Sequence, residues 1–296
     1  SASMTWQTDN NELLLRSDWR YCRKTGIWLR SDTLTNESNE DVVIRRCLAR
    51  FSLSPGSYEL YSQGSRWCGE NQGSWQALER GGVVLRSEGG RTTQGGTPFV
   101  CIRDSDSKEA LIFHIIPKGN WIIKVTAGTA EGDSPSFAVV ELGMADTHLF
   151  YSLAPGRSIE LPQILIQKAP KGEPHLAAPN LHVYLLENIF AANEESVPIV
   201  YNTWFDDFEF LAVPRLRRQL KAAKEIGCEV FVVDAGWYGG AAGSWSEQTG
   251  DWREKEDAAF EGRMADFAEE VRSEGLGFGL WMEPERLCKS VPIRIE

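Results

Sequence analysis

Carboxylate side chains follow three short apolar runs in the last third of the chain. The acidic residues behind these runs are Asp206 and Asp207, then Asp234, then Glu283 and Glu285. An ionised carboxylate has two acceptor oxygens, so it can bind two hydroxyl groups at once. The runs are typical of buried parallel strands, and the carboxyl ends of such strands carry the active site in a β/α barrel. We therefore expect these side chains to gather at one polar site.

The chain is also rich in tryptophan, with 11 residues among 296. Several of them stand beside Gly and Asp in segments that we expect to be loops. Flat apolar rings flanked by carboxylates are common in sugar-binding sites, so one interpretation is a carbohydrate ligand. The other is that most of the rings fill the core, because each buries a large apolar area.

The elements that position these side chains are expected to alternate between strand and helix. The apolar runs 199–204, 230–233 and 276–281 predict three short strands. Two helices are expected between them, and their apolar faces are Leu216, Leu220, Ala223 and Ile226, then Phe260, Met264, Phe267 and Val271. Pro214 suits the first turn of the first helix, and Gly227 follows its end. This order predicts a parallel β/α layer.

The first part of the chain follows a different pattern. Runs rich in β-branched and aromatic residues, such as 42–44, 110–115 and 121–125, are separated by Gly and Pro turn signals. Many short strands of this kind predict a large antiparallel β-sandwich. We expect the sandwich over residues 1–180, a linker or helix over 181–198, and an α/β domain over 199–296.

Composition and charge argue against several classes of protein. The net charge of −11 argues against a nucleic-acid partner, because phosphate backbones require a basic face. No apolar run approaches the roughly 18 residues that a membrane helix requires. The first residues show no signal-peptide pattern, so we expect a cytoplasmic protein.

The cysteines and histidines show no spacing that is typical of a metal site. The 6 cysteines are scattered singly, without a C-x-x-C spacing, and the 4 histidines show no H-x-x-x-H spacing. We therefore expect no metal site. The cysteines are expected to be buried free thiols rather than a disulfide framework.

Several sequence blocks occur together in an order and spacing that are specific. They are Tyr-Asn-Thr-Trp at 201–204, FVVDAGWYG at 231–239, Gly-Asp-Trp at 250–252 and FGLWMEPE at 278–285, with GRTT at 90–93 and GNW at 119–121. With these blocks the chain resembles glycoside hydrolase family 36, the bacterial-type α-galactosidases. The resemblance implies a β-supersandwich followed by a (β/α)8 TIM-type barrel, of which residues 199–296 would be the first three units.

The resemblance also implies roles for individual residues. Trp204 and Trp281 would form apolar walls of the sugar subsite, and Asp234 would accept hydrogen bonds from the C4 and C6 hydroxyls of the terminal sugar. Alternatives stay open from the residues alone. Asp234 could cap the loop that follows it, and Trp281 could simply pack in the core.

Three further residues are candidates for a supporting role around this subsite. Asp251 and Trp252 would order the long loop before them. Glu283 could support the sugar-binding residues or be purely structural, and the structural role is favoured.

Two departures from the family pattern bear on the expected activity. Ala235 stands where the family has a second aspartate, and losing a charged acceptor costs about 1.5–3 kcal/mol of sugar binding. The terminal sugar would therefore be galactose or a related sugar. The family's nucleophile motif K-x-D-x-N, and its later acid/base aspartate, do not occur in residues 1–296. We expect no catalytic residue in this chain, and no activity from it alone.

The resulting hypothesis is an α-galactosidase-like retaining glycoside hydrolase that forms a covalent glycosyl–Asp intermediate. This hypothesis implies no metal and no organic cofactor, and it does not distinguish hydrolysis from transfer to another sugar. The alternatives are a non-catalytic carbohydrate-binding or assembly subunit, or a fragment without activity. Expected partners are an α-galactoside substrate and either a homo-oligomer or a complementing chain that supplies the rest of the barrel.

Overall fold

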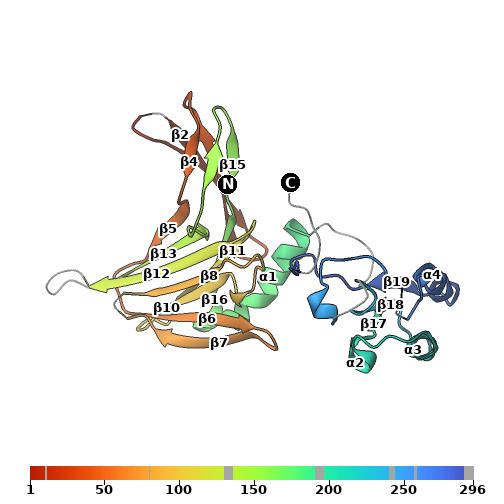
Figure 1. Cartoon of the computed structure of the whole chain (residues 1–296). Coiled ribbons are helices and arrows are strands. Elements are labelled where there is room, and N and C mark those ends of the chain that lie inside the picture. Colours follow the sequence, from red (N-terminus) through yellow and green to blue (C-terminus); the bar gives the residue numbers. More distant parts are fainter. Residues whose placement is uncertain are drawn as a thin grey trace. The chain divides into compact units, whose positions relative to one another are not determined.

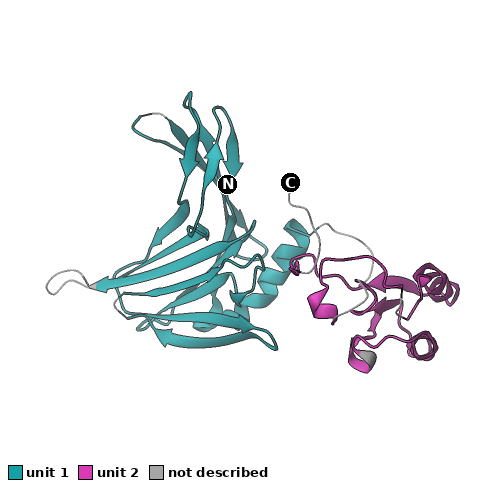
Figure 2. Cartoon of the chain, in the orientation of Figure 1, with its two compact units in different colours: residues 1–192 teal, residues 193–296 magenta. Residues whose placement is uncertain are grey.

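The computed structural model describes residues 1–10, 12–79, 81–129, 136–190, 197–239, 244–256 and 259–289. Contacts divide the chain into two compact units, residues 1–192 and residues 193–296 (Figure 2). Each unit has a hydrophobic core of its own. The division falls inside 181–198, the segment that we propose as the linker.

Unit 1 is built from two main antiparallel sheets and one small pair of strands (Figure 1). The larger sheet contains, in spatial order, β1 (Ala2–Gln7), β2 (Leu13–Cys22), β3 (Ile27–Asn36), β16 (Gln163–Ala169), β11 (Ala110–Ile116), β10 (Phe99–Asp104), β6 (Tyr58–Arg66) and β7 (Gly69–Ala77), with β15 (Ser158–Glu160) beside β3 and β9 (Gly95–Gly96) beside β6. The other sheet contains β5 (Leu48–Ser52), β13 (Ser136–Met144), β12 (Trp121–Thr129) and β8 (Val83–Ser87). The small pair is β4 (Val42–Ile44) with β14 (Tyr151–Leu153).

The main core of unit 1 lies between these two sheets. Val100 and Phe113 come from the larger sheet, and Trp121, Val140 and Leu142 come from the smaller one. Successive strand residues point to opposite faces, so each sheet can bury one row of apolar side chains against the other. The predicted sandwich is therefore confirmed.

A short 3-10 turn, η1 (Pro170–Gly172), leads into the helix α1 (Pro174–Asn188). This helix begins before the expected start at residue 181, because Pro174 has a fixed φ that suits the first turn. Tyr184 of α1 packs against Ile27 and Leu165 of the larger sheet. The helix thus covers part of one sheet face.

Unit 2 is a three-stranded parallel sheet with helices (Figure 1). Its elements are β17 (Val200–Asn202), α2 (Trp204–Asp207), α3 (Val213–Glu225), β18 (Val230–Val233), the 3-10 turn η2 (Trp245–Glu247), α4 (Met264–Ser273) and β19 (Gly277–Leu280). Strand β18 is central and pairs in parallel with β17 and β19. This order confirms the predicted parallel β/α layer.

The apolar face of α3 and the strands make the core of unit 2. Leu216 and Leu220 of α3, Phe231 of β18 and Val271 of α4 are all buried in it. Two expected helix residues lie outside their helices. Ile226 follows the end of α3 and is exposed, whereas Phe260 precedes α4 and reaches the core from a loop.

Three further sequence expectations can be compared with the described residues. No helix in the described segments is long and apolar enough to cross a lipid bilayer. All six cysteines are free thiols. Their predicted burial holds for Cys101 alone, because Cys68 is exposed and the other four are partly exposed.

Candidate functional site

The carboxyl ends of the three parallel strands of unit 2 bring the candidate residues to one edge of the sheet. Asn202 ends β17, Asp234 directly follows β18, and Trp281 directly follows β19. The backbone N–H of Trp281 donates to the carbonyl of Val233 at 2.9 Å. This bond extends the pairing of the strands and places Trp281 beside the start of the Asp234 loop.

The Asp234 carboxylate is buried and held from two sides. Its side chain belongs to a residue that is 7% exposed. Oδ2 accepts a hydrogen bond from Nδ2 of Asn202 at 2.7 Å, and Oδ1 accepts one from the backbone N–H of Ala235 at 2.7 Å. The backbone N–H of Asp234 donates to Oγ1 of Thr203 at 3.0 Å. Each carboxylate oxygen has two acceptor positions, and these contacts use one position on each oxygen.

The two tryptophans proposed as apolar walls both contact a third, Trp245. The ring centroids of Trp204 and Trp245 are 5.4 Å apart with an interplanar angle of 82°. Those of Trp245 and Trp281 are 5.5 Å apart at 87°. Both are edge-to-face contacts, a favoured geometry for aromatic pairs. Trp245 begins the turn η2 and links the end of β17 with the end of β19 through its ring.

Further aromatic rings pack against Trp281. Trp252 lies 6.4 Å from Trp281 and 4.6 Å from Tyr238, measured between ring centroids. The indole N–H of Trp237 donates to the carbonyl of Trp281 at 3.1 Å. We call Trp204, Trp237, Tyr238, Trp245, Trp252 and Trp281 the aromatic cluster. Trp252, one of the expected supporting residues, is part of it.

Asp251, the second expected supporting residue, is engaged elsewhere. Its carboxylate forms an ion pair with Arg253 at 2.6 Å. The hydrogen bond from Arg253 holds the pKa of Asp251 below its usual value. Within the described part of the chain, the carboxylate contacts of Asp251 are with Arg253 and do not reach Asp234 or the aromatic cluster.

Glu283 is connected to the loop that carries Trp245. It is 8% exposed, and its Oε2 lies 3.5 Å from Nε of Arg286. The guanidinium of Arg286 donates to the carbonyl of Ser246 at 3.0 Å and to Oγ1 of Thr249 at 2.7 Å. It also lies over the ring of Trp245, at 5.3 Å from the ring centroid. These contacts favour a structural role for Glu283.

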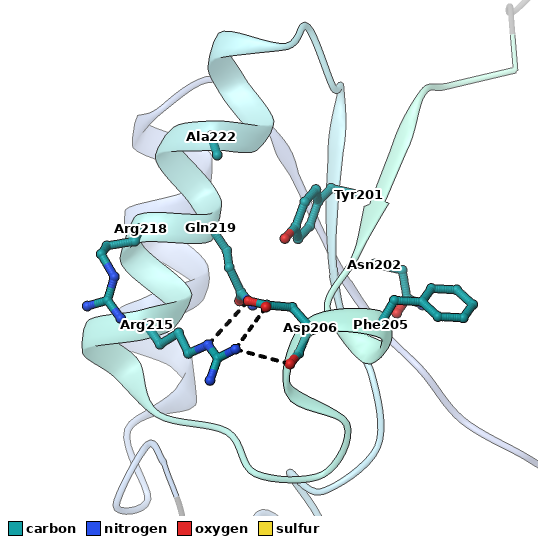
Figure 3. A pocket seen from close by; sticks show the side chains of 8 residues that line it. All are labelled: Tyr201, Asn202, Phe205, Asp206, Arg215, Arg218, Gln219 and Ala222. Carbon is teal, nitrogen blue, oxygen red and sulfur yellow. Dashed lines mark hydrogen bonds and ion pairs between the residues drawn. The ribbon is translucent and has the colours of Figure 1, made fainter.

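Asp206 does not join the other carboxylates, contrary to expectation. It forms an ion pair with Arg215 of α3 at 2.8 Å, and the hydrogen bond from Arg215 holds the pKa of Asp206 below its usual value. Figure 3 shows this pair at a hollow of about 700 Å³ that β17, α2 and α3 line. Asp206 pairs with Arg215 of α3 instead of joining the other carboxylates' site, and sequence spacing does not reveal this pairing. Glu285 is exposed, and the side chain of Asp207 lies outside the described residues.

The described residues contain no group of three or more His, Cys, Asp or Glu side chains placed to hold a metal ion. At this edge of the sheet, the Asp234 carboxylate is held in one orientation, and the aromatic cluster lies at the same strand ends. An arrangement of this kind can bind a polar ring that carries hydroxyl groups on one side and C–H groups on the other.

Three residues of this arrangement were missed by sequence reasoning. They are Asn202, Trp245 and Arg286. Asn202 stands inside the Tyr-Asn-Thr-Trp block and could have been suspected from that block. Trp245 and Arg286 carry no signal beyond their residue type.

Comparison with known families gives two matches that follow one another along the chain. The model of the glycosyl hydrolase family 36 N-terminal domain matches residues 3–132, and the melibiase model matches residues 158–293. Among curated relatives, alpha-galactosidase Mel36A of Lactobacillus acidophilus is 24% identical over 272 residues, which are 90% of this chain and 36% of that protein. Alpha-galactosidase AgaA of Geobacillus stearothermophilus is 24% identical over 273 residues, 88% of this chain and 36% of that protein. The chain thus spans little more than a third of these relatives.

Solved structures give the same result for the fold. The family 36 alpha-galactosidase AgaB of Geobacillus stearothermophilus superposes with a TM-score of 0.80 at 19% identity, over 95% of this chain and 39% of that one. A variant of AgaA from the same organism, in complex with raffinose, gives a TM-score of 0.78 at 20% identity, again over 95% and 39%. The expected sandwich followed by the first part of a barrel is therefore confirmed.

Proposed function

The chain belongs to glycosyl hydrolase family 36, and we propose that it is the N-terminal part of an α-galactosidase-like retaining glycoside hydrolase. One observation carries the proposal. The Asp234 carboxylate, fixed by Asn202, lies at the carboxyl ends of the parallel strands together with the aromatic cluster. In β/α barrels this is the edge where substrates bind.

In this proposal Asp234 recognises the terminal sugar. The hydrogen bonds from Asn202 and Ala235, both described residues, use one acceptor position on each of its oxygens. We propose that the second positions accept hydrogen bonds from two sugar hydroxyls, those at C4 and C6. A hydrogen bond to a charged group is worth about 1.5–3 kcal/mol, or roughly ten- to a hundredfold in affinity. A sugar whose C4 hydroxyl points the other way forfeits that bond. Trp204 and Trp281 are proposed as the apolar walls that pack against the C–H face of the ring.

Ala235 limits how narrowly the sugar can be specified. The residue is 1% exposed and its side chain is a buried methyl group that accepts no hydrogen bond. Its backbone N–H is used to orient Asp234. With one carboxylate in place of the family's two, we propose galactose or a closely related sugar as the terminal residue of the substrate.

Catalysis itself is not assigned to any residue of this chain. Retaining hydrolysis requires two carboxyl groups about 5–5.5 Å apart across the scissile bond. Asp234 is already committed to hydroxyl recognition, and no K-x-D-x-N sequence occurs in residues 1–296. We propose that residues 1–296 alone bind the sugar without cleaving it.

The free edges of the unit 2 sheet suggest the partner. Among the described strands, β17 and β19 each pair with β18 alone. Ile199 and Val200 at the β17 edge, and Phe205 beside it, are each at least half exposed. A barrel strand pairs on both sides, so we propose that further strands complete this sheet, supplied by the same polypeptide or by a complementing chain.

The test is an assay of the native protein that contains this chain, with p-nitrophenyl α-galactoside and p-nitrophenyl α-glucoside as substrates. We expect release of p-nitrophenol from the galactoside only. The variant Asp234→Asn keeps the side-chain shape and removes its charge, so kcat/KM should fall at least tenfold. The matched control is Asp266→Asn, at an exposed carboxylate in the first turn of α4, which should leave kcat/KM unchanged. No release from either substrate would defeat the proposal.

Non-catalytic sugar binding is the second candidate, and Ala235 favours it because one acceptor of the family's site is missing. It predicts a saturable change of tryptophan fluorescence with raffinose, without any product. Turnover of the galactoside by the native protein would exclude it.

A further inference from the structure

Asn202 connects the proposed sugar-binding carboxylate with one of the proposed apolar walls. Its Nδ2 donates to Oδ2 of Asp234 at 2.7 Å. Its Oδ1 accepts the backbone N–H of Trp204 at 2.8 Å. The amide of Asn202 therefore donates a hydrogen bond to the loop after β18 and accepts one from the first residue of α2.

The chemistry of an amide explains why asparagine suits this position. An amide carries both a donor and an acceptor, whereas a carboxylate offers acceptors only and an aliphatic side chain offers neither. The donor is also neutral, so it orients the Asp234 carboxylate without pairing with its charge. The charge stays available to a ligand hydroxyl, which a lysine or arginine in the same place would not allow.

The position of Asn202 in the sheet makes this bridge rigid. Asn202 is the last residue of β17 and lies opposite Val232 of β18 in the parallel ladder. The next residue, Thr203, donates its backbone N–H to the carbonyl of Val232 at 3.1 Å and accepts the backbone N–H of Asp234 through Oγ1. The side chain and the backbone of Asp234 are thus both hydrogen-bonded to residues at the end of β17.

We propose that Asn202 is a positioning residue for sugar recognition, which sets the orientation of the Asp234 carboxylate and the start of the Trp204 helix together. The inference rests on the proposed function, because the two residues that it positions are the ones proposed to bind the sugar. Asn202 itself touches no substrate in this scheme. It acts by holding the Asp234 carboxylate in the orientation in which its oxygens can accept hydrogen bonds from the sugar.

Replacing the amide separates this role from a general structural one. Asn202→Asp keeps the shape of the side chain and places two carboxylates in contact. Two carboxylates that share a site cannot both ionise at low cost, so the pair holds a shared proton up to a higher pH than an isolated carboxyl group. The shared proton restores a donor between the two groups. Sugar binding by Asn202→Asp should therefore improve as the pH is lowered, whereas that of the unaltered protein should not.

The experiment measures kcat and KM for p-nitrophenyl α-galactoside with the native protein and its variants Asn202→Asp and Asn202→Ala, between pH 5 and pH 8. We expect KM to rise about tenfold in Asn202→Ala, with a smaller change in kcat, because binding is weakened in ground state and transition state alike. In Asn202→Asp the increase in KM should be large at pH 8 and should shrink toward pH 5. The control Asn188→Asp alters an exposed amide at the end of α1 and should change neither constant. A pH profile of Asn202→Asp parallel to that of the native protein would overturn the inference.

A measurement without substrate separates this inference from the proposed function. Carboxyl resonances of protein labelled with 13C-aspartate follow the titration of Asp234 directly. If positioning is correct, Asn202→Asp gives two coupled titration steps at this site in place of one. An unchanged Asp234 titration in Asn202→Asp would overturn the positioning role. Absence of galactoside turnover in the unaltered protein would instead defeat the proposed function alone.

Discussion

The ring of Trp245 meets the ring of Trp281 edge-to-face, with 5.5 Å between the ring centroids. Because Trp245 makes the same kind of contact with Trp204, it links the two proposed walls of the subsite. The three rings come from separate segments of the chain, so their arrangement depends on the loop that carries Trp245.

Removal of the Trp245 ring should weaken sugar binding. Trp245→Ala deletes two edge-to-face contacts, each worth about 0.5–1.5 kcal/mol beyond the area that it buries. The affinity of the native protein for galactose, the proposed terminal sugar, should then fall at least fivefold in calorimetric titration. The control is Trp67→Ala, because Trp67 is 81% exposed in unit 1 and should leave the affinity unchanged. Equal affinities for both variants would show that Trp245 does not support the walls.

Arg286 should control the order of the same loop. Arg286→Met keeps much of the apolar stem and removes the hydrogen bonds to Ser246 and Thr249 together with the ion pair to Glu283. Loss of hydrogen bonds to a charged group should lower the free energy of unfolding by about 1.5–3 kcal/mol. Hydrogen exchange of residues 244–250 should also become faster. Arg253→Met removes an exposed ion pair with Asp251 and serves as the control, with an expected loss below about 1 kcal/mol.

Sequence reasoning reached the order of elements in unit 2 because two strong signals coincide there. The run at 230–233 is β18 itself, and Pro214 and Gly227 bracket α3. Periodicity predicts that Ile226 belongs to the helix, but α3 ends at Glu225, because periodicity does not mark where a helix ends. Phe260 was assigned to a helix for a similar reason, since burial in a loop and burial on a helix give the same pattern.

The contacts within the candidate site could be predicted only in part. The block at 201–204 and Asp234 come from the family resemblance, and their roles stay predictions. The bridge made by Asn202 depends on the register of β17 against β18, which no single-strand pattern contains. Trp245 lies in a Gly-rich loop whose path follows from contacts with Arg286 and the other rings. Asp206 was misplaced because its partner, Arg215, is selected by the packing of α3.

Unit 1 should lose stability in mild acid because of His114. Burial lowers the pKa of His114 to about 4, and its ring stacks on Phe99 with 5.1 Å between the centroids. In the unfolded chain the imidazole titrates near pH 6.5, so below that pH the unfolded state binds the proton more readily. Stability is therefore unaffected above about pH 6.5 and falls toward pH 4, by up to about 3 kcal/mol.

Thermal unfolding between pH 7.5 and pH 4.5 checks this expectation. His114→Phe retains a planar ring beside Phe99 and cannot be protonated, so its melting temperature should fall less with acid than that of the unaltered chain. His175→Phe, at an exposed histidine of α1, should keep the full acid dependence. The idea would be refuted by equal acid dependence in the unaltered chain and in His114→Phe.

Gly236 should be intolerant of any side chain, for two separable reasons. Its φ of +102° is a conformation that L side chains rarely adopt, and a Cβ atom there would lie 2.4 Å from the carbonyl oxygen of Glu209. The backbone of Glu209 must therefore move in Gly236→Ala. The carboxylate of Glu209 accepts the backbone N–H of Trp245 at 2.8 Å, so the displacement should reach the proposed subsite.

Gly227→Ala is the control that measures the cost of a positive φ without a steric clash. Gly227 also has a positive φ, of +84°, but no atom lies within 4 Å of the added Cβ. Gly227→Ala should lower the free energy of unfolding by about 1 kcal/mol, and Gly236→Ala should lower it by at least about 2 kcal/mol more. Gly236→Ala alone should also weaken binding of galactose. Equal losses of stability in urea unfolding would mean that the close approach of the Glu209 backbone to Gly236 adds no cost beyond the strain of a positive φ.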